Sequence, residues 1–272
     1  MKIVNLDTLM EVAIDATRQA GALLRMHWER GVAAEHKGAI DLVTEADRAA
    51  EALILRVIRE RFPAHGFLAE ESGKSDTRSS HVWIIDPLDG TTNFAHGYPQ
   101  FAVTLALQID GRTELGVTLD VLRGELFTAQ RDRGAFLNGQ PIRVSNTPDL
   151  ASSLLVTGFP YDRQTSLHNN VRQHEAFLMR CQGVLRAGSA SLDLAAVACG
   201  RLDGYWEFKL FPWDMAAGVL LVELAGGRVT DTGGGPPGLH SPGIVAGNGL
   251  IHQEMLDVLR ETPLQSAAGA VA

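Results

Sequence analysis

Residues 83–94, WIIDPLDGTTNF, form the stretch around which the rest of this chain is organised. The apolar run 83–85 predicts a short buried strand, because a brief apolar segment before Pro and Gly is typical of strands. Asp86 and Asp89 follow on a turn that Pro87 stiffens, and Gly90 is free to adopt a strained backbone conformation. A helix that starts at the polar residues 91–93 would direct free N–H groups at an anion. Two carboxylates beside such an anion site indicate that a cation lies between them.

The same letters have a simpler interpretation. An Asp-Pro-x-Asp-Gly run is a common loop turn that needs no chemistry. Local composition alone leaves both interpretations open, so the remainder of the chain has to decide between them.

Length and charge limit the classes of function. The 272 residues, with 45% hydrophobic and 21% charged residues and a mean hydropathy of +0.01, are ordinary for a globular protein with an ample core. The formal charge of −8 repels nucleic acid and anionic membranes, so we expect no direct nucleic-acid or membrane binding. A phosphate-bearing substrate would be repelled as well, unless bound cations reverse the local field.

Cysteine usage and the N-terminus predict a cytoplasmic location. Cys181 and Cys199 lack a second thiol at metal-ligand spacing, which favours core thiols in a reducing compartment. Acidic residues interrupt any apolar segment near the N-terminus, and no run of 18 apolar residues could span a membrane.

The first half of the chain predicts an α+β arrangement. An amphipathic helix starts near Leu6 and ends before Gly31, and a second helix follows Thr44 and closes at Phe62. Residues 66–69 predict a strand that runs into Glu70 and Glu71. The β-rich runs 101–108, 113–121 and 125–130 predict antiparallel hairpins, because turn dipeptides separate them.

From about residue 151 the pattern changes to alternating strands and helices, which predicts an α/β arrangement. We therefore expect an N-terminal domain over residues 1–150, a C-terminal domain over 151–262, and a mobile Ala-rich tail over 263–272. The predicted strands are 152–159, 183–187, 204–208, 228–231 and 243–248, and the predicted helices are 171–179, 191–200, 213–227 and 250–260.

The run DPLDGTTNF resembles the signature of the inositol monophosphatase family, which are magnesium-dependent, lithium-sensitive phosphatases. Three further segments resemble family motifs in the expected order: LVTEAD with Asp47, the Glu70–Glu71 pair, and WDMAAG with Asp214. Ala69 departs from the pattern, since the family normally has glycine before the glutamate pair. The resemblance extends from Lys37 to Gly227. It implies a layered αβαβα sandwich of the inositol monophosphatase and fructose-1,6-bisphosphatase type, usually as a homodimer.

The resemblance also implies a set of metal ligands. One Mg²⁺ would be held by Glu70, Asp86 and the Leu88 carbonyl, and a second by Asp86, Asp89 and Asp214. A weaker third site would involve Glu70, which gives two to three ions. Oxygen ligands without His or Cys suit Mg²⁺, and gathered carboxylates would repel one another without cations.

Catalytic roles follow from the same resemblance. Glu70 and Thr91 would orient the attacking water, Asp47 would hydrogen-bond Thr91, and Lys37 would lie near the metal cluster. From the residues alone, Asp47 is equally well explained as an acid that favours a helix N-terminus, whereas a helix cap is the better explanation for Asp214 and solvated surface the better one for the glutamate pair. The resemblance favours the functional interpretation.

Substrate binding is the least specific part of the prediction. The amides of Gly90 and Thr91 would bind phosphate beside Asp89, and Glu207 would accept hydrogen bonds from ring hydroxyls. Gly188, Ser189 and Ala190 would line the same pocket. Glu207 is otherwise an ordinary strand acid. The predicted activity is hydrolysis of a small polyol phosphate, most of all myo-inositol monophosphate.

Other activities of the same fold stay open. Fructose 1,6-bisphosphate and histidinol phosphate are alternative substrates, whereas Thr92-Asn93-Phe94 argues against nucleotide phosphates. In a different class, some bacterial relatives bind the transcription machinery. Because all the carboxylate ligands are present, an enzyme is the leading prediction.

Overall fold

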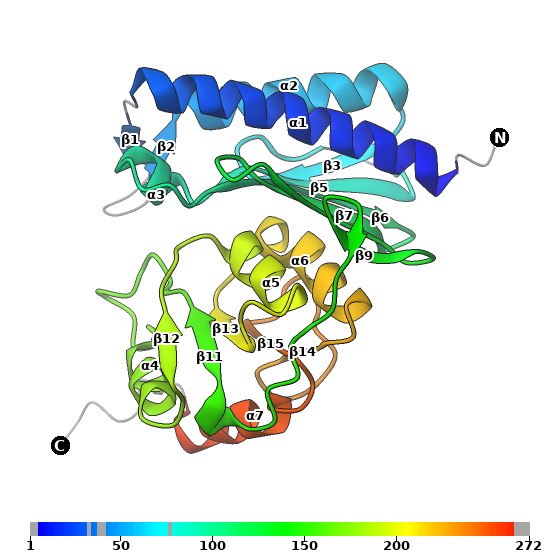
Figure 1. Ribbon diagram of the computed structural model, residues 1–272. Helices are drawn as coiled ribbons and strands as arrows, with labels where there is room; N and C mark the ends of the chain where they lie inside the picture. The colour runs from blue at the N-terminus through cyan, green and yellow to red at the C-terminus, as the bar shows by residue number, and fades with distance from the viewer. Residues whose placement is uncertain (1–4, 32–33, 37–41, 76–77, 264–272) are drawn as a thin grey trace.

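The computed structural model describes residues 5–31, 34–36, 42–75 and 78–263. Two antiparallel helices, α1 (Leu6–Arg30) and α2 (Glu45–Arg61), pack together across one face of a large sheet (Figure 1). Each is amphipathic as predicted: α1 buries Leu9, Ala13, Ala20 and Leu24 at helical spacing, and its polar face is solvated.

The large sheet has eight strands in the order β10-β9-β8-β7-β6-β5-β3-β4. Its strand β5 runs parallel to β3 and antiparallel to β6, and the other neighbours are antiparallel. The bounds are β3 (Gly66–Ala69), β4 (Gly73–Lys74), β5 (His81–Asp89), β6 (Ala102–Ile109), β7 (Arg112–Asp120), β8 (Glu125–Gln130), β9 (Gly134–Leu137) and β10 (Gln140–Pro141).

The strand β5 is longer than its sequence predicts. A turn was expected after Ile85, yet the strand continues through Pro87 to Asp89, with a shift in its register against β6 between Asp86 and Asp89. Such a bulge tolerates a proline, because the unpaired residues there need no donor for the ladder. The short helix α3 (Thr91–Ala95) follows at the predicted position.

A second sheet of five strands has the order β12-β11-β13-β15-β14. Its strands are β11 (Leu154–Thr157), β12 (Gly183–Leu185), β13 (Gly204–Phe208), β14 (Arg228–Asp231) and β15 (Gly243–Gly247). The remaining helices are α4 (Val171–Leu178), α5 (Ala190–Ala198), α6 (Pro212–Leu224) and α7 (His252–Glu261), with a 3-10 turn at Leu150–Ser152. The sequence therefore predicts every helix of this half.

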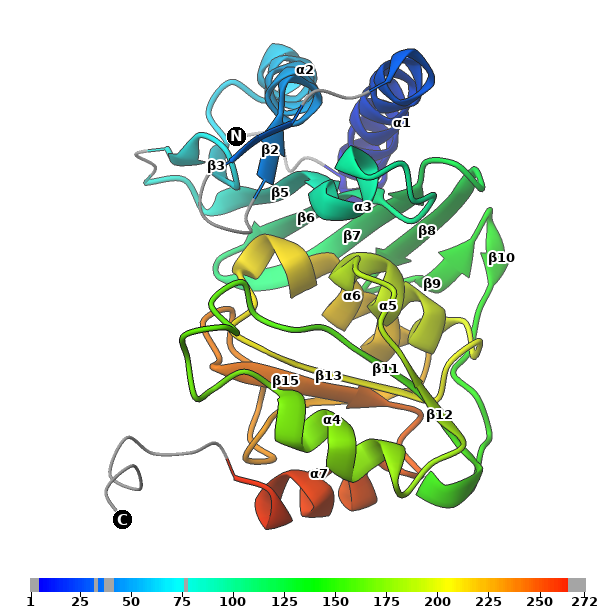
Figure 2. The ribbon, with the colours of Figure 1, turned by 90° about the vertical axis from the view of Figure 1, so that its left-hand side faces the viewer.

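Helices α5 and α6 lie between the two sheets, and α4 and α7 cover the outer face of the smaller one (Figures 1 and 2). At Gly116 of β7, an added Cβ would lie 2.9 Å from the Ala217 Cα, so the absent side chain lets α6 approach the large sheet. The observed layers confirm the predicted αβαβα sandwich.

One core joins the two halves of the chain. Phe127 and Ala129 of β8 pack in the same buried cluster as Val156 of β11 and Leu221 of α6. The proposed division at residue 150 stays a prediction, and the tail from 264 lies outside the described residues. Three short strands were not predicted: β4, β1 (Ala34–His36) and β2 (Leu42–Thr44). Within the described ranges, no helix is long and apolar enough to cross a membrane.

Candidate active site

The site is built where β3 and β5 end side by side. The parallel register pairs Ala69 with Ile85, and the Glu70 amide continues the ladder by donating to the Ile85 carbonyl at 3.2 Å. The next residue on each strand, Glu70 and Asp86, therefore lies beside the other, and the two side chains interact directly. Two separate sequence motifs become one acidic pair.

The Glu70 turn is held by a residue that the sequence did not single out. Glu51 of α2 is only 3% exposed, and its carboxylate accepts from the amides of Glu71 and Ser72 at 2.8 and 2.9 Å. The two hydrogen bonds that Glu51 accepts from these backbone amides fix the loop that carries Glu70. A glutamate inside a helix gave no local signal of this long-range role.

Asp86 and Asp89, near the end of β5, have different hydrogen-bond partners. Asp86 is 2% exposed and its Oδ1 accepts from the Leu88 amide at 3.0 Å. Asp89 is 8% exposed, and its Oδ2 accepts from the Ser189 hydroxyl and the Ser191 amide, both at 2.7 Å, and from the Ser191 hydroxyl at 2.5 Å. The start of α5 is thus tied to β5.

Gly90 allows the segments around Gln100 and Gly188 to pack closely against the end of β5. Its φ of 100° lies in the left-handed region, and an added Cβ would lie 2.9 Å from the Gln100 carbonyl and 3.3 Å from that of Gly188. Asn93 completes the junction, because its Nδ2 donates to the carbonyls of Gln100 and Ala187 at 2.7 and 2.8 Å. The sequence marked Asn93 only as part of a signature, and its bridging role was missed.

The Thr91 hydroxyl lies between Asp47 and Leu88. Its Oγ1 is 3.0 Å from the Asp47 Oδ1 and 3.0 Å from the Leu88 carbonyl, and Asp47 is fully buried. The predicted contact between Asp47 and Thr91 is present. Because the first backbone bond of α3 runs from Phe94 to Gly90 at 3.0 Å, the amides of Gly90 and Thr91 precede the helical ladder. The predicted Lys37 lies outside the described residues.

Asp214 brings a third element to the same place. It lies in the first turn of α6, and its Oδ2 accepts from the Phe211 amide at 2.7 Å, which caps the helix. The capping role expected from the residues alone is therefore real. It coexists with proximity to the acidic pair, since the charges of Asp89 and Glu70 both act on Asp214.

Burial and mutual repulsion govern the protonation of this cluster. Burial raises the pKa of Asp86 well above its usual value, and the charges of Glu70, Asp89 and Asp214 raise it further. Burial also raises the pKa of Asp214 well above normal, followed by the charge of Asp89. For Asp89, burial raises the pKa, and the donors on Ser191 and Ser189 partly offset the rise.

The donor set fits hard divalent cations. Among the described residues, the charges that act most strongly on Asp86 and Asp214 are those of neighbouring carboxylates, so a bound cation would relieve their mutual repulsion. In the part of the chain that the structure describes, no three His, Cys, Asp or Glu side chains already form a coordination sphere. Asp89 and Asp214 each accept protein hydrogen bonds on Oδ2, so a cation at this cluster would bind their carboxylates alongside those donors.

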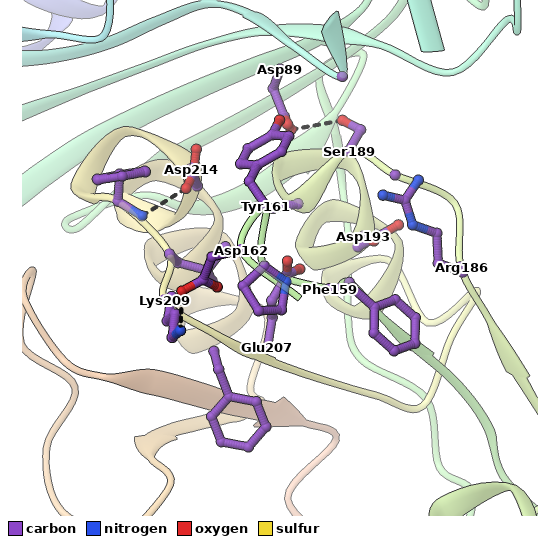
Figure 3. Close-up of a pocket in the computed structure, with 18 residues that line it drawn as sticks. Asp89, Phe159, Tyr161, Asp162, Arg186, Ser189, Asp193, Glu207, Lys209 and Asp214 are labelled. Carbon is purple, nitrogen blue, oxygen red and sulfur yellow. Dashed lines mark hydrogen bonds and ion pairs between the residues drawn. The ribbon is translucent and has the colours of Figure 1, made fainter. Parts of the chain in front are cut away.

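A pocket of about 350 Å³ opens in front of Asp89 and Asp214 (Figure 3). It brings together seven predicted residues: Asp89, Gly90, Gly188, Ser189, Ala190, Glu207 and Asp214. Glu70, Asp86, Leu88, Thr91 and Asp47 are not among its lining residues. Pocket residues that the sequence did not indicate include Phe159, Tyr161, Asp162, Arg186, Asp193 and Lys209.

Glu207 occupies the pocket wall opposite Asp89. Burial raises its pKa to about 7, and the Tyr205 hydroxyl, which donates to its Oε2 at 2.7 Å, opposes the rise. Asp193 is 2% exposed, and its pKa is raised well above normal by burial and then by Glu207. This wall is rich in hydrogen-bond acceptors.

Comparison with known proteins gives one consistent result. The inositol monophosphatase family model matches residues 5–264. An inositol-1-monophosphatase of Synechocystis sp. is 49% identical to this chain, and the match covers 95% of this chain and 91% of that protein's length. The Nus factor SuhB of Pseudomonas aeruginosa is 46% identical, over 93% and 96%. The solved inositol monophosphatase of Anabaena (Nostoc) sp. has a TM-score of 0.88 and 45% identity, over 97% of this chain and 100% of its own.

Proposed function

The chain belongs to the inositol monophosphatase family and is a phosphatase, and we propose that it hydrolyses a small polyol phosphate, with myo-inositol monophosphate as the leading substrate. The observation that carries the proposal is the convergence of Glu70, Asp86, Asp89 and Asp214 beside a pocket walled by Glu207. Mg²⁺ dependence and lithium sensitivity are expected with it.

We assign the cation ligands residue by residue. Glu70, Asp86 and the Leu88 carbonyl would hold one Mg²⁺, Asp86, Asp89 and Asp214 a second, and Glu70 would contribute to a weaker third. When bound, such ions supply a nucleophile at neutral pH and neutralise charge on the attacking and leaving oxygens.

The protein's own groups orient the reactants. Thr91 is held by Asp47 and Leu88, so its hydroxyl oxygen is fixed in position, and together with Glu70 it would align a water for in-line attack on phosphorus. The amides of Gly90 and Thr91 would bind phosphate oxygens. Near Ser189 and Ala190, the pocket would receive the alcohol.

Glu207 gives a test of alcohol recognition. We expect Glu207→Gln to raise KM for myo-inositol monophosphate about ten-fold at pH 8 and to change kcat little. Glu207, with a pKa of about 7, is mostly ionised at that pH, and a hydrogen bond to a charged acceptor contributes about 1.5–3 kcal/mol. Steady-state kinetics at saturating Mg²⁺ measure it. Glu223→Gln is the matched control, since Glu223 lies near the other end of α6 and pairs with Arg131 at 3.3 Å. An unchanged KM would make Glu207 an ordinary strand acid.

A substrate panel tests the function itself. Phosphate release should be highest with inositol monophosphate and should require Mg²⁺, compared with fructose 1,6-bisphosphate, histidinol phosphate and a nucleotide phosphate. A preference for fructose 1,6-bisphosphate or histidinol phosphate would change the proposed substrate and leave the proposed mechanism unchanged. No release from any sugar or polyol phosphate would refute the proposal.

A second candidate role is interaction with the transcription machinery, because relatives 46% and 44% identical are named Nus factor SuhB. It is compatible with catalysis. Purified protein and its Asp89→Asn variant, used as bait with purified RNA polymerase, would separate the two roles. Binding by both supports the role, and binding by neither removes it.

Assembly and location remain proposals. We infer a homodimer and a cytoplasmic protein without direct nucleic-acid binding, from the family resemblance and the net charge of −8. Sedimentation analysis of the purified chain measures the oligomeric state.

A further inference from the structure

The connection between β13 and α6 contains an unusual backbone conformation. In the described ranges, four residues other than glycine have a positive φ: Asp110, Asn138, Asn170 and Lys209. Asp and Asn tolerate the left-handed region because their short side chains can form local hydrogen bonds with the backbone. A lysine side chain offers no such local compensation. Lys209, with φ of 59°, is therefore the exception among them. Glycine would fit this position better, so the side chain of Lys209 is the feature that needs an explanation.

That side chain lies at the pocket, beside Asp162. Its Nζ donates to the Asp162 Oδ2 at 2.6 Å (Figure 3) and to the Ser166 hydroxyl at 2.8 Å. Both Lys209 and Asp162 line the pocket, two and forty-five residues from Glu207 in sequence. The ion pair therefore joins the segment that carries Glu207 and Asp214 to the loop over residues 158–170.

The base of this loop is fixed independently. Asn170 is fully buried, and its Nδ2 donates to the Gly158 carbonyl at 2.7 Å and the Thr157 hydroxyl at 2.8 Å. Its Oδ1 accepts from the Trp206 indole at 2.7 Å. Because these bonds close the loop at its base, the contacts with Lys209 act mainly on the position of Asp162 at the pocket.

We propose that Asp162, held by Lys209, is a specificity-determining residue that accepts hydrogen bonds from hydroxyls of the alcohol at the outer end of the pocket. The proposal rests on the proposed phosphatase function and deepens it. Lys209 occupies the Oδ2 of Asp162, which leaves Oδ1 for a substrate donor, and an ionised carboxylate is an acceptor only.

The chemistry of the wall defines the class of alcohol. The cationic side chains of Lys209 and Arg186 also line the pocket, where Glu207, Asp193 and Asp162 carry carboxyl groups. An uncharged alcohol with several hydroxyls can donate to more than one of them. The site therefore favours a polyol monophosphate over a phosphate ester whose alcohol part has no further hydroxyl.

The test compares two substrates in two variants. For wild type, Asp162→Asn and Lys209→Gly, kcat/KM is measured for myo-inositol monophosphate and for p-nitrophenyl phosphate, whose leaving group offers no further hydroxyl. The ratio of the two values should fall at least about five-fold in each variant, mainly through KM of the inositol ester. In the double variant, the ratio should fall no further than in the more affected single variant, because the two residues act as a pair.

A stability measurement separates this role from a structural one. Lys209→Gly relieves the positive φ, so its midpoint of thermal unfolding should equal or exceed that of wild type while the substrate ratio falls. If Lys209 only supported the fold, stability would fall and the ratio would not change. Glu261→Gln is the matched control. Glu261 lies on α7, outside the pocket, and forms an exposed ion pair with Arg180, so its replacement should leave the ratio unchanged.

Two failures are distinguishable. An active wild type with an unchanged ratio in Asp162→Asn and Lys209→Gly overturns the inference and leaves the phosphatase intact. A wild type inactive on both esters refutes the proposed function.

Discussion

Replacing Asp89 by asparagine is expected to lower phosphate release from inositol monophosphate by about 10³-fold or more while the protein stays folded. Asp89 is proposed as a ligand of one cation and lies at the pocket floor. A metal ion contributes several kcal/mol to stabilising charge in the transition state, and each 1.36 kcal/mol corresponds to a factor of ten in rate. Loss of about 4 kcal/mol therefore gives the stated effect.

The fold should tolerate this substitution. The Ser189 hydroxyl, the Ser191 amide and the Ser191 hydroxyl all donate to the same oxygen of Asp89, Oδ2, so the carbonyl oxygen of asparagine can keep all three hydrogen bonds. The substitution also removes a buried charge whose pKa burial had raised. The midpoint of thermal unfolding in metal-free buffer should therefore equal or exceed that of wild type.

Kinetics with Mg²⁺ and circular dichroism check both parts of this prediction. Asp132→Asn is a suitable control, because Asp132 is an exposed acid in the turn after β8. Near-normal turnover by a folded Asp89→Asn variant would remove Asp89 from the proposed cation site.

Removing divalent cations is expected to destabilise the wild-type protein at pH 8 much more than at pH 5. A ligand at one hundred times its dissociation constant stabilises the native state by about 2.7 kcal/mol. For a chain of this size, that corresponds to a shift of about 5–10 °C in the unfolding midpoint. The effect should be visible without any activity assay.

The direction of the pH effect follows from the raised pKa values. Asp86, Asp89 and Asp214 have folded-state pKa values above the usual 3.8, so between pH 4 and those values the native state binds more protons than the unfolded state. Stability of the cation-free protein therefore falls as pH rises through this window. At the proposed site Mg²⁺ would bind the ionised carboxylates, so we expect its stabilising effect to grow as pH rises.

Thermal unfolding with a chelator and with Mg²⁺, at pH 5 and pH 8, measures these shifts. The Asp89→Asn variant should respond less, because it retains fewer ionised ligands. An identical midpoint with and without Mg²⁺ at pH 8 would count against a cation site at this cluster.

Short-range patterns explain most of what the sequence predicted correctly. The helices α1, α2, α5, α6 and α7 have apolar spacing or stop signals within their own residues, and WIIDPLDGTTNF marks its own strand and helix. The extension of β5 to Asp89 was missed, because pairing with β6 across a bulge overrides the local turn tendency of Asp-Pro.

Site residues without a local signal were missed for a related reason. Glu51 looks like any polar residue of a helix, and its role depends on the Glu70 turn twenty residues away. Asp162 lies in an irregular loop, and Lys209 shows its strained backbone only in three dimensions. Composition and spacing carry no information about such partners.

By itself, the sequence determined which carboxylates we propose as cation ligands, on DPLDGT, on the glutamate pair and on WDMAAG, together with the helices and strands that carry them. Only the tertiary structure decided how those ligands meet and what surrounds the alcohol. The parallel pairing of β3 with β5 places Glu70 beside Asp86, and the packing of α5 and α6 between two sheets brings Ser189, Glu207 and Asp214 to Asp89. Local propensities act over a few residues, whereas these contacts join residues up to a hundred or more apart, so only long-range packing can select them.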